Sequence, residues 1–500
     1  MCRALDHPDA PELSEAAKLV RDGERVVFII GRGGGGHKAA ARAVEACFEG
    51  SSTEIETMDA GYVIEGIVWN KPPRSQPGPL DMDELYNTLM RHGLHGFTGF
   101  MGILARALSI FGKPRIVKGL AKQWKARPPA LVVSFIPYFN AVFREALQLA
   151  NPRATMVTCV TDFASSREHY WIDQFCADTS GKHIVVAGTP RLQRQCVEQG
   201  YPKANVLKTT GMVVHPSFHR DAPLDAKPLP APSPAAGDDE AGPSSAGARR
   251  ALVCFGGYPP MRVEAIVNAL LELEPTLEVV VLCGGNAPLL KRLRARGGCV
   301  AEPMLPSERV GELMRWASFV VGKPGPGVVT EACACGTAFV TERHAVMPQE
   351  EDVLEWIEEC GVGVVLDSLL DLPADLTRQV AQCMPKAIER MHANRAVFEV
   401  ADLCRTLIVE ATGNEADVDG VIPCVPAPAA AIECCAVDGA ADSCGDACDT
   451  LMTKMMGCGG GVHHAHRRVP STEMAPGDEF GTGASGVLVD TNGTHQTDDD

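Results

Sequence analysis

The stretch best suited to chemistry begins with the apolar run Val26–Ile30. The glycine-rich turn Gly31–Gly36 follows at once, and then His37 and an alanine-rich segment. This order predicts a strand, a tight turn and the start of a helix. Glycines let a ligand approach backbone N–H groups, and a helix start adds a partial positive charge of about half a unit. The turn is therefore suited to an anionic group.

Three kinds of site compete for this turn. Its glycine spacing satisfies G-x-G-x-x-G, the pattern of an NAD-dependent oxidoreductase. Acidic residues that could hold a ribose follow at the end of the next predicted strand: Glu54, Glu56 and Asp59. A P-loop is excluded, because no Lys-Ser/Thr pair follows the last glycine. The third interpretation is the acceptor side of a two-domain glycosyltransferase, with His37 facing a cleft.

A second glycine turn lies in the other half of the chain, where Lys323, Gly325 and Gly327 precede a predicted helix that carries Glu331. Glu331 lies about one turn into that helix, so its carboxylate can face ribose hydroxyls while phosphates rest on the N–H groups of the turn. The alternative is a surface helix with a solvated glutamate. The segment predicts a binding site for a nucleotide diphosphate.

Two more segments are expected at the same cleft. Gly256 and Gly257 form a turn after the first strand of this half, and Gln349 and Glu350 open a helix that follows another strand. Side chains at the carboxyl ends of strands project into the cleft of an open α/β sheet, and amide and carboxylate groups bind sugar hydroxyls. Alone, such a cluster would more often be the charged start of a helix.

These residues must be positioned by two sheets. Apolar runs alternate with helical patterns in both halves, which predicts two doubly wound α/β domains with parallel strands covered on both faces. The expected strands are Val26–Ile30, Thr53–Met58, Ala130–Phe135, Thr155–Val160 and His183–Val186, then Ala251–Phe255, Leu277–Leu282, Phe319–Val321, Ala338–Thr341 and Val362–Leu366. The predicted domain boundaries are an extension 1–24, an acceptor and membrane domain 25–220, a linker 221–249, a donor domain with a return helix 250–412, and a disordered tail 413–500.

Composition narrows the class of protein. With 500 residues, 45% hydrophobic and 22% charged, the chain fits a soluble globular protein, and its formal charge of −17 argues against nucleic-acid binding. The 19 cysteines are scattered through predicted strands and helices, so we expect them to be reduced. The spacing of the Cys/His segment of the tail fits no zinc template cleanly. The Asp81-Met82-Asp83 triplet matches the D-x-D of metal-dependent transferases of another fold, but it lies in a polar, proline-flanked segment away from the predicted donor site. No metal or tightly bound cofactor is therefore expected.

The motifs resemble, in order, those of the family 28 glycosyltransferases, above all monogalactosyldiacylglycerol synthases and more distantly the peptidoglycan UDP-GlcNAc transferase. Gly34–Ala41 is similar to Gly-Gly-Gly-His-Arg-Ala-Ser-Ala, and Lys323–Glu331 to Lys-Ala-Gly-Pro-Gly-Thr-Ile-Ala-Glu. Two intervening signatures are matched by Val160-Thr161-Asp162 with Tyr170-Trp171 and by Gly211–Phe218. Where the synthases read Gly-Gln-Glu-x-Gly-Asn, this chain reads Pro348-Gln349-Glu350-Glu351-Asp352, which leaves the sugar open.

The resemblance implies a GT-B fold of two facing Rossmann-like domains and the transfer of a hexose, first of all galactose, from a UDP-sugar to a lipid such as 1,2-diacylglycerol. It implies that His37 is the general base, a role for which an unperturbed imidazole pKa of about 6.5 is suitable. Gly35 and Gly36 would lie on the acceptor side. An oxidoreductase and a non-catalytic nucleotide-binding protein remain the alternatives.

A lipid acceptor requires a membrane surface, and residues 85–127 are suited to one because they contain basic and aromatic residues but no Asp or Glu. Each Lys or Arg near an anionic bilayer contributes about 1 kcal/mol. The residues expected at the acceptor or the membrane are Phe97, Phe100, Lys118, Lys122, Trp124 and Lys125. The alternative is an ordinary helix with a basic outer face. We expect a peripheral membrane protein on a cytosolic face; no transit peptide is recognisable, and a plastid envelope remains open.

Overall fold

The computed structural model describes residues 24–31, 35–69, 98–164, 169, 171–172, 182–219, 250–344 and 346–412. Most of the N-terminal extension, the linker and the tail lie outside these residues, as do the Asp81–Asp83 triplet and the Cys/His segment. The boundaries proposed there remain predictions.

The N-terminal half forms a six-stranded sheet in the order β2-β1-β3-β4-β5-β6, and every pair of neighbours is parallel. Its strands are β1 (Arg25–Ile30), β2 (Glu54–Asp59), β3 (Leu131–Ser134), β4 (Thr155–Cys159), β5 (His183–Ala187) and β6 (Val206–Lys208). The sequence did not predict β6, because three residues with one buried side chain give no recognisable period.

Helices cover both faces of this sheet: α1 (Gly36–Ala46), α2 (Ala60–Trp69), α4 (Thr98–Phe111), α5 (Lys113–Ala126), α6 (Asn140–Ala150) and α7 (Pro190–Glu198). Alternate residues of β1 face opposite layers, as the two-residue period of a strand requires. Val26 and Phe28 pack in the core that contains α1, whereas Val27 and Ile29 pack in the core of α2, α5 and α6. The continuous apolar run is therefore explained by burial on two sides.

The C-terminal half forms a second six-stranded parallel sheet in the order β12-β11-β10-β7-β8-β9. The strands are β7 (Arg250–Cys254), β8 (Glu278–Leu282), β9 (Val300–Glu302), β10 (Phe319–Val321), β11 (Ala338–Glu342) and β12 (Gly363–Leu366). The helices are α8 (Val263–Leu273), α9 (Ala287–Arg296), α10 (Ser307–Trp316), α11 (Pro326–Ala334), α12 (Pro348–Cys360) and α13 (Leu376–Ala393). The apolar sides of α8, α9 and α13 cover one face, and α10, α11 and α12 cover the other.

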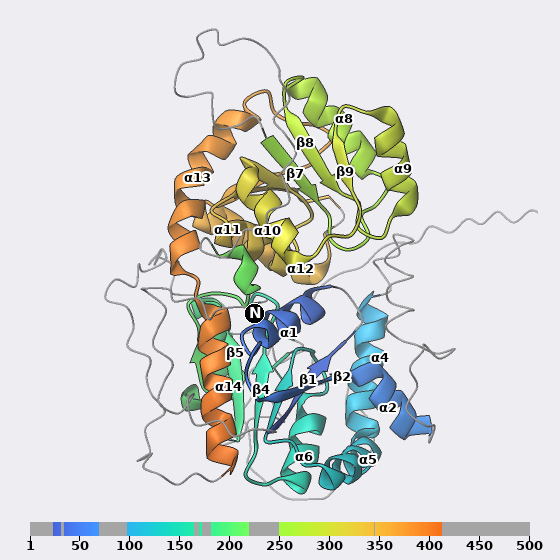
Figure 1. The fold of residues 1–500 in the computed structure, drawn as a ribbon, viewed down its shortest axis with the longest axis vertical. Coiled ribbons are helices and arrows are strands. Elements are labelled where there is room, and N and C mark those ends of the chain that lie inside the picture. Colours follow the sequence, from blue (N-terminus) through green and yellow to red (C-terminus); the bar gives the residue numbers. More distant parts are fainter. Residues whose placement is uncertain are drawn as a thin grey trace, which may run out of the picture. The chain divides into compact units, whose positions relative to one another are not determined.

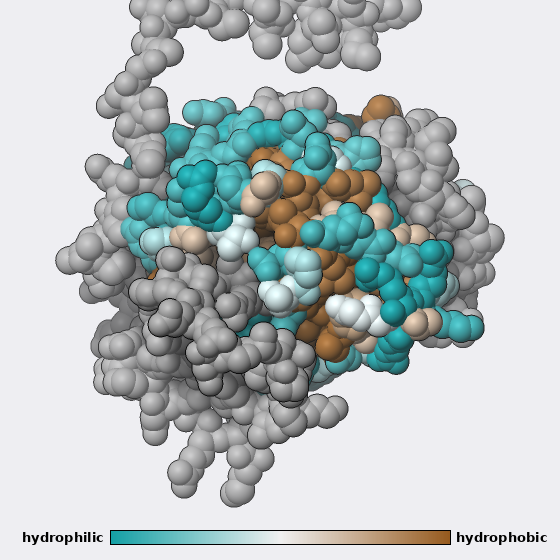
Figure 2. All heavy atoms as spheres, turned by 90° about the horizontal axis from the view of Figure 1, so that it is seen from above, coloured by the Kyte–Doolittle hydropathy of each residue, from teal (hydrophilic) through white to brown (hydrophobic). Residues whose placement is uncertain are grey.

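The predicted fold class, two doubly wound parallel α/β sheets, is confirmed. Figure 1 shows each sheet with its own helices. On the face drawn in Figure 2, hydrophilic residues surround an apolar strip.

The final helical stretch consists of two helices, with a break before α14 (Ala396–Thr412). At the break, the side-chain amide of Asn394 donates to the carbonyl of Met212 at 3.0 Å, and the N–H of Arg395 donates to the hydroxyl of Thr210 at 2.7 Å. Beyond it, α14 packs into the core of the N-terminal sheet (Figure 1). The chain thus starts and ends its described part in the same core.

We expect α14 to be required for the stability of the N-terminal sheet. Ile408 is fully buried against that sheet, so Ile408→Ala should lower the free energy of unfolding by about 2–5 kcal/mol in a urea titration. Glu410→Ala, at an exposed position of the same helix, is the control and should change it by less than about 0.5 kcal/mol. Equal effects of the two changes would show that α14 is not part of this core.

Candidate functional site

The predicted glycine turns lie where each sheet reverses its strand order. β1 lies between β2 and β3, so successive crossovers leave it on opposite sides, and β7 lies between β8 and β10 in the same way. Open α/β sheets bind ligands at the carboxyl ends of the strands at such switch points. The turn before α1 follows β1, and the turns at Gly256 and Gly325 follow β7 and β10. Arg32, Gly33 and Gly34 lie outside the described residues.

One pocket is lined by loop and helix residues from both halves of the described chain. It lies at the starts of α1 and α11, which contact each other, and it includes the segment 212–215. The lining residues are Gly36, Ala39, Ala40, Val160, Thr161, Met212, Val213, Val214, His215, Pro326, Gly327, Thr330 and Glu331. The structure therefore brings together Gly36, Gly327 and Glu331, which were chosen from segments almost 300 residues apart.

Glu331 is the unusual charged group of this pocket. Its carboxylate makes no hydrogen bond or ion pair with the rest of the chain that the structure describes. Removal from water raises the pKa of this carboxyl group from 4.5 to about 7. A carboxylate that is desolvated and lacks a protein partner is placed to accept hydrogen bonds from a ligand.

His37 lies in the first turn of α1, where Thr161 and Trp171 restrict its ring. Nδ1 is 3.4 Å from the hydroxyl of Thr161, and the ring centroid is 5.5 Å from that of Trp171 at an angle of 51°. Trp171 is fixed in turn, because its indole N–H donates to the carboxylate of Asp162 at 2.7 Å. The predicted base is thus held by the segment that follows β4.

Lys323 and Glu350, both predicted donor residues, contact each other. The ammonium nitrogen of Lys323 lies 3.0 Å from Glu350 Oε1, and Glu350 Oε2 accepts from the N–H of Met347 at the start of α12. Glu350 is buried, whereas Lys323 is partly exposed. The pair therefore joins the turn after β10 to the first turn of α12. The side chain of Gln349 lies outside the described part of the structure.

Gly256 and Gly257 form a close-packed turn. Gly256 has φ = +79°, a conformation that favours glycine. The carbonyl of Gly257 accepts from the N–H of Gly285 at 2.8 Å, and a Cβ on Gly284 would lie only 2.3 Å from that oxygen. Backbone conformation therefore favours glycine at position 256 and close packing requires it at position 284, whereas a Cβ on Gly257 would meet no atom closer than 3.7 Å.

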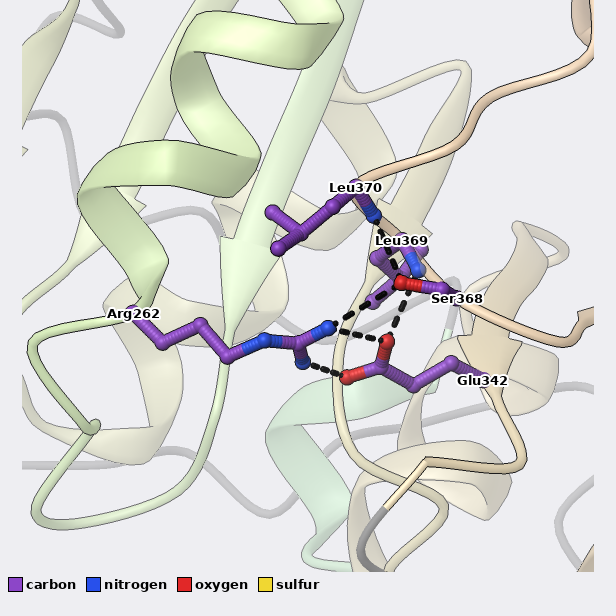
Figure 3. A network of polar contacts seen from close by, with 5 residues as sticks. All are labelled: Arg262, Glu342, Ser368, Leu369 and Leu370. Atoms are coloured by element: carbon purple, nitrogen blue, oxygen red, sulfur yellow. Dashed lines mark hydrogen bonds and ion pairs between the residues drawn. The ribbon is translucent and has the colours of Figure 1, made fainter.

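A network of polar contacts joins the loops at the carboxyl ends of three strands of the C-terminal sheet (Figure 3). Arg262, in the loop after β7, makes a double contact with the buried Glu342 at the end of β11. Glu342 also accepts from the N–H of Leu369 at 2.7 Å, and Arg262 donates to Ser368 at 3.2 Å. The loops that follow β7, β11 and β12 are thus tied together at the ligand-binding edge of the sheet.

The predicted membrane segment is only partly as expected. Lys118, Lys122 and Lys125 are exposed along α5, as a membrane-facing surface requires. The expectation for Trp124 is wrong: only 2% of it is exposed, because it lies on the inner side of α5 and packs in the core. Phe97 and the side chain of Phe100 lie outside the described residues.

The sequence motifs contain three polar residues for which the sequence indicated no role. They lie at or next to the pocket: Thr161, Asp162 and His215. Burial lowers the pKa of His215, which favours its neutral form. Its Nδ1 accepts from the N–H of Ser217 at 3.3 Å, so its Nε2 carries the proton in that form. Thr161 and Asp162 directly follow β4, and position at the carboxyl end of a strand was a signal that could have identified them.

Within the described ranges, no group of three or more His, Cys, Asp and Glu side chains could hold a metal ion. No helix in that part of the chain is long and apolar enough to cross a membrane.

The chain is similar to enzymes of glycolipid synthesis. Monogalactosyldiacylglycerol synthase from Spinacia oleracea is 24% identical over 397 residues, covering 73% of this chain and 67% of that protein. The processive diacylglycerol beta-glucosyltransferase of Staphylococcus carnosus is 23% identical over 303 residues, covering 60% and 71%. The resemblance drawn from the motifs is thereby confirmed.

No family model matches the chain. Among solved structures, MurG from Acinetobacter baumannii aligns with a TM-score of 0.44 and 14% identity, covering 76% of this chain and 99% of that one. Neither the galactolipid synthase nor the diacylglycerol glucosyltransferase is an oxidoreductase, and the NAD-dependent alternative gains no support from them.

The raised pKa of Glu331 predicts a pH-dependent cost to stability. Between pH 4.5 and about 7 the carboxyl group of Glu331 keeps its proton in the folded chain but releases it in the unfolded chain. The free energy of unfolding therefore falls as the pH rises through this range. Glu331→Gln removes the cost of burying an ionised carboxylate. The change should therefore raise the free energy of unfolding by about 1–3 kcal/mol at pH 8 and by little at pH 5.

Urea unfolding at the two pH values measures this difference. Glu359→Gln, an exposed change, serves as the control and should have no comparable effect at either pH. A Glu331→Gln effect that is equal at pH 5 and pH 8 would contradict the raised pKa.

Proposed function

We propose that this protein is a glycosyltransferase that moves a hexose, with galactose as the first candidate, from a UDP-sugar to a lipid such as 1,2-diacylglycerol. The observation that supports this most is the pocket in which the helix start carrying His37 meets the helix start carrying Glu331. The similarity to a galactolipid synthase and to a diacylglycerol glucosyltransferase supports the choice of donor and acceptor.

The donor binds at the C-terminal sheet. Its diphosphate lies at the N-terminus of α11, where the N–H groups of the first turn near Gly327 and the helix dipole stabilise negative charge. The N–H of Gly325 itself donates to the carbonyl of Lys323 at 2.7 Å. Lys323, on the same turn, adds a positive charge. Glu331 accepts hydrogen bonds from the ribose hydroxyls, which gives the desolvated carboxylate its missing partners.

The transfer is a single displacement. The acceptor hydroxyl oxygen forms a bond with the anomeric carbon while the bond from that carbon to the diphosphate oxygen breaks, and UDP leaves with the electron pair. His37 takes the hydroxyl proton at Nε2, the ring nitrogen opposite the one near Thr161. The N–H groups at the start of α11 stabilise the charge that develops on the leaving diphosphate.

The acceptor is reached from a membrane surface at α4 and α5. On α4, Ile103, Leu104, Ile110 and Phe111 are exposed, and 85% of Phe111 is accessible. Lys118, Lys122 and Lys125 lie exposed on the adjoining α5. Apolar side chains that enter a bilayer beside lysines that meet anionic headgroups would give a peripheral attachment at a cytosolic face.

The decisive experiment is transfer from labelled UDP-galactose, UDP-glucose and UDP-N-acetylglucosamine to diacylglycerol in liposomes. The chain should label the lipid with one of these sugars. His37→Ala should lower the turnover number by about 10²–10⁴-fold, because it removes the proton acceptor, while UDP affinity stays within about twofold.

Glu331→Ala is the complementary variant, and should weaken UDP binding by about 1.5–3 kcal/mol in calorimetry. A protein that binds UDP but labels no lipid would favour a non-catalytic nucleotide-binding role. Full turnover of His37→Ala would end the assignment of the base, and unchanged UDP affinity of folded Glu331→Ala would exclude ribose recognition.

The membrane surface is tested separately. Replacing Lys118, Lys122 and Lys125 by Gln should weaken the free energy of binding to anionic liposomes, measured by co-sedimentation. The loss should be about 3 kcal/mol or less at low salt, and smaller at high salt. Activity on a detergent-solubilised acceptor should be retained.

The matched control changes three exposed lysines elsewhere, Lys203, Lys208 and Lys291, to Gln. It alters the net charge equally and should leave liposome binding nearly unchanged. If both triple variants lose binding equally, or neither does, α5 is an ordinary helix with a solvated basic face.

A further inference from the structure

An ion-pair cluster joins the helices of the two sheets. Arg191, near the start of α7 on the N-terminal sheet, places Nη1 3.0 Å from Glu355 and Nη2 3.8 Å from Asp352. Both acids belong to α12 of the C-terminal sheet. Asp352 is only 4% exposed, so this contact takes a charge largely out of water.

The same helix turn carries a donor residue. Glu350, two residues before Asp352, pairs with Lys323 of the turn where the diphosphate would lie. Asp352 is also where the sequence departs from the Gly-Asn ending of the related motif. One turn of α12 therefore contacts the donor turn through one carboxylate and the N-terminal sheet through another.

A ring contact links α12 to the segment that holds His37. The rings of Phe163 and Trp356 lie 4.9 Å apart between centroids, at an angle of 38°. Phe163 directly follows Thr161 and Asp162, which contact His37 and Trp171. A shift of α12 would therefore move both the turn that carries Lys323 and the segment that contacts His37.

We propose that Arg191 is a positioning residue for hexosyl transfer, which holds α12 against the N-terminal sheet and thereby fixes the donor turn relative to His37. The inference rests on the proposed function for its effect on catalysis. The size of the effect follows from exposure: Arg191 and Glu355 are 41% and 52% exposed, which makes their pair weak, whereas the buried Asp352 strengthens the cluster. We expect a three- to tenfold change.

The test compares Glu355→Gln with Glu358→Gln. Glu358 lies on the same helix and pairs with Arg343, which directly follows β11 in the same half of the chain, and the exposure of Glu358 is similar at 46%. Glu355→Gln and Arg191→Gln should each lower kcat about three- to tenfold while the affinity for UDP stays within about twofold, and Glu358→Gln should leave kcat unchanged. Raising the salt concentration should lower the kcat of the unaltered chain toward that of Arg191→Gln.

Exchanging the charges distinguishes positioning from local damage. The double change Arg191→Glu with Glu355→Arg should recover part of the kcat that Arg191→Glu alone loses, and only part because Asp352 still faces position 191. Amide hydrogen exchange gives a readout that does not depend on activity: in Arg191→Gln, exchange should be faster in α12 and in residues 161–164, and unchanged in α8.

Equal kcat for Glu355→Gln and Glu358→Gln, or an unaltered exchange pattern in Arg191→Gln, would overturn the proposal. A chain that neither binds UDP nor transfers hexose would refute the proposed function and, with it, the catalytic part of this inference. Hydrogen exchange would still decide whether Arg191 holds α12, so the two failures are distinguishable.

Discussion

The candidate site depends on the parallel order of the two sheets. Parallel strands end at one edge, and only beside β1 and β7 do the crossovers leave in opposite directions and keep that edge open. The chain places glycine turns at both switch points. Gly322, which directly follows β10, is required by packing alone, because a Cβ there would lie 2.2 Å from the carbonyl oxygen of Cys254. Close backbone approach and anion binding thus favour the same residue type there.

The pocket also depends on how the chain returns to its first core. Because α14 packs into the N-terminal core, the break before it lies next to the segment that leads into the pocket. The side chain of Asn394 donates to the carbonyl of Met212 there. A Cβ on Gly211 would lie only 2.6 Å from the side chain of Asn394. Met212, on the pocket wall, is therefore positioned by a residue 182 places later in the sequence.

Charge is distributed to match these roles. The charges of Arg262 and Glu342 are paired at the edge of the C-terminal sheet, and the charge of Glu350 is paired with that of Lys323. Glu331 is left desolvated in the pocket, a cost that a structural carboxylate would avoid and that a ligand with hydroxyl groups would repay. In a chain with a formal charge of −17, the exposed lysines of α5 form a local reversal of sign.

The sequence by itself determined the two parallel sheets, the glycine turns and the contributing segments, because each is written in a local pattern: apolar runs of strand length, glycines before a helical period, and residues at strand ends. It could not place Trp124, since an aromatic ring among lysines fits either the inner or the outer side of α5, and only packing against the sheet chose the inner one. The pairing of Lys323 with Glu350, the contacts of Arg191 with α12, and the meeting of Gly36 with Glu331 join residues far apart along the chain. Such contacts are decided by tertiary structure, because sequence periodicity describes only neighbours within one element.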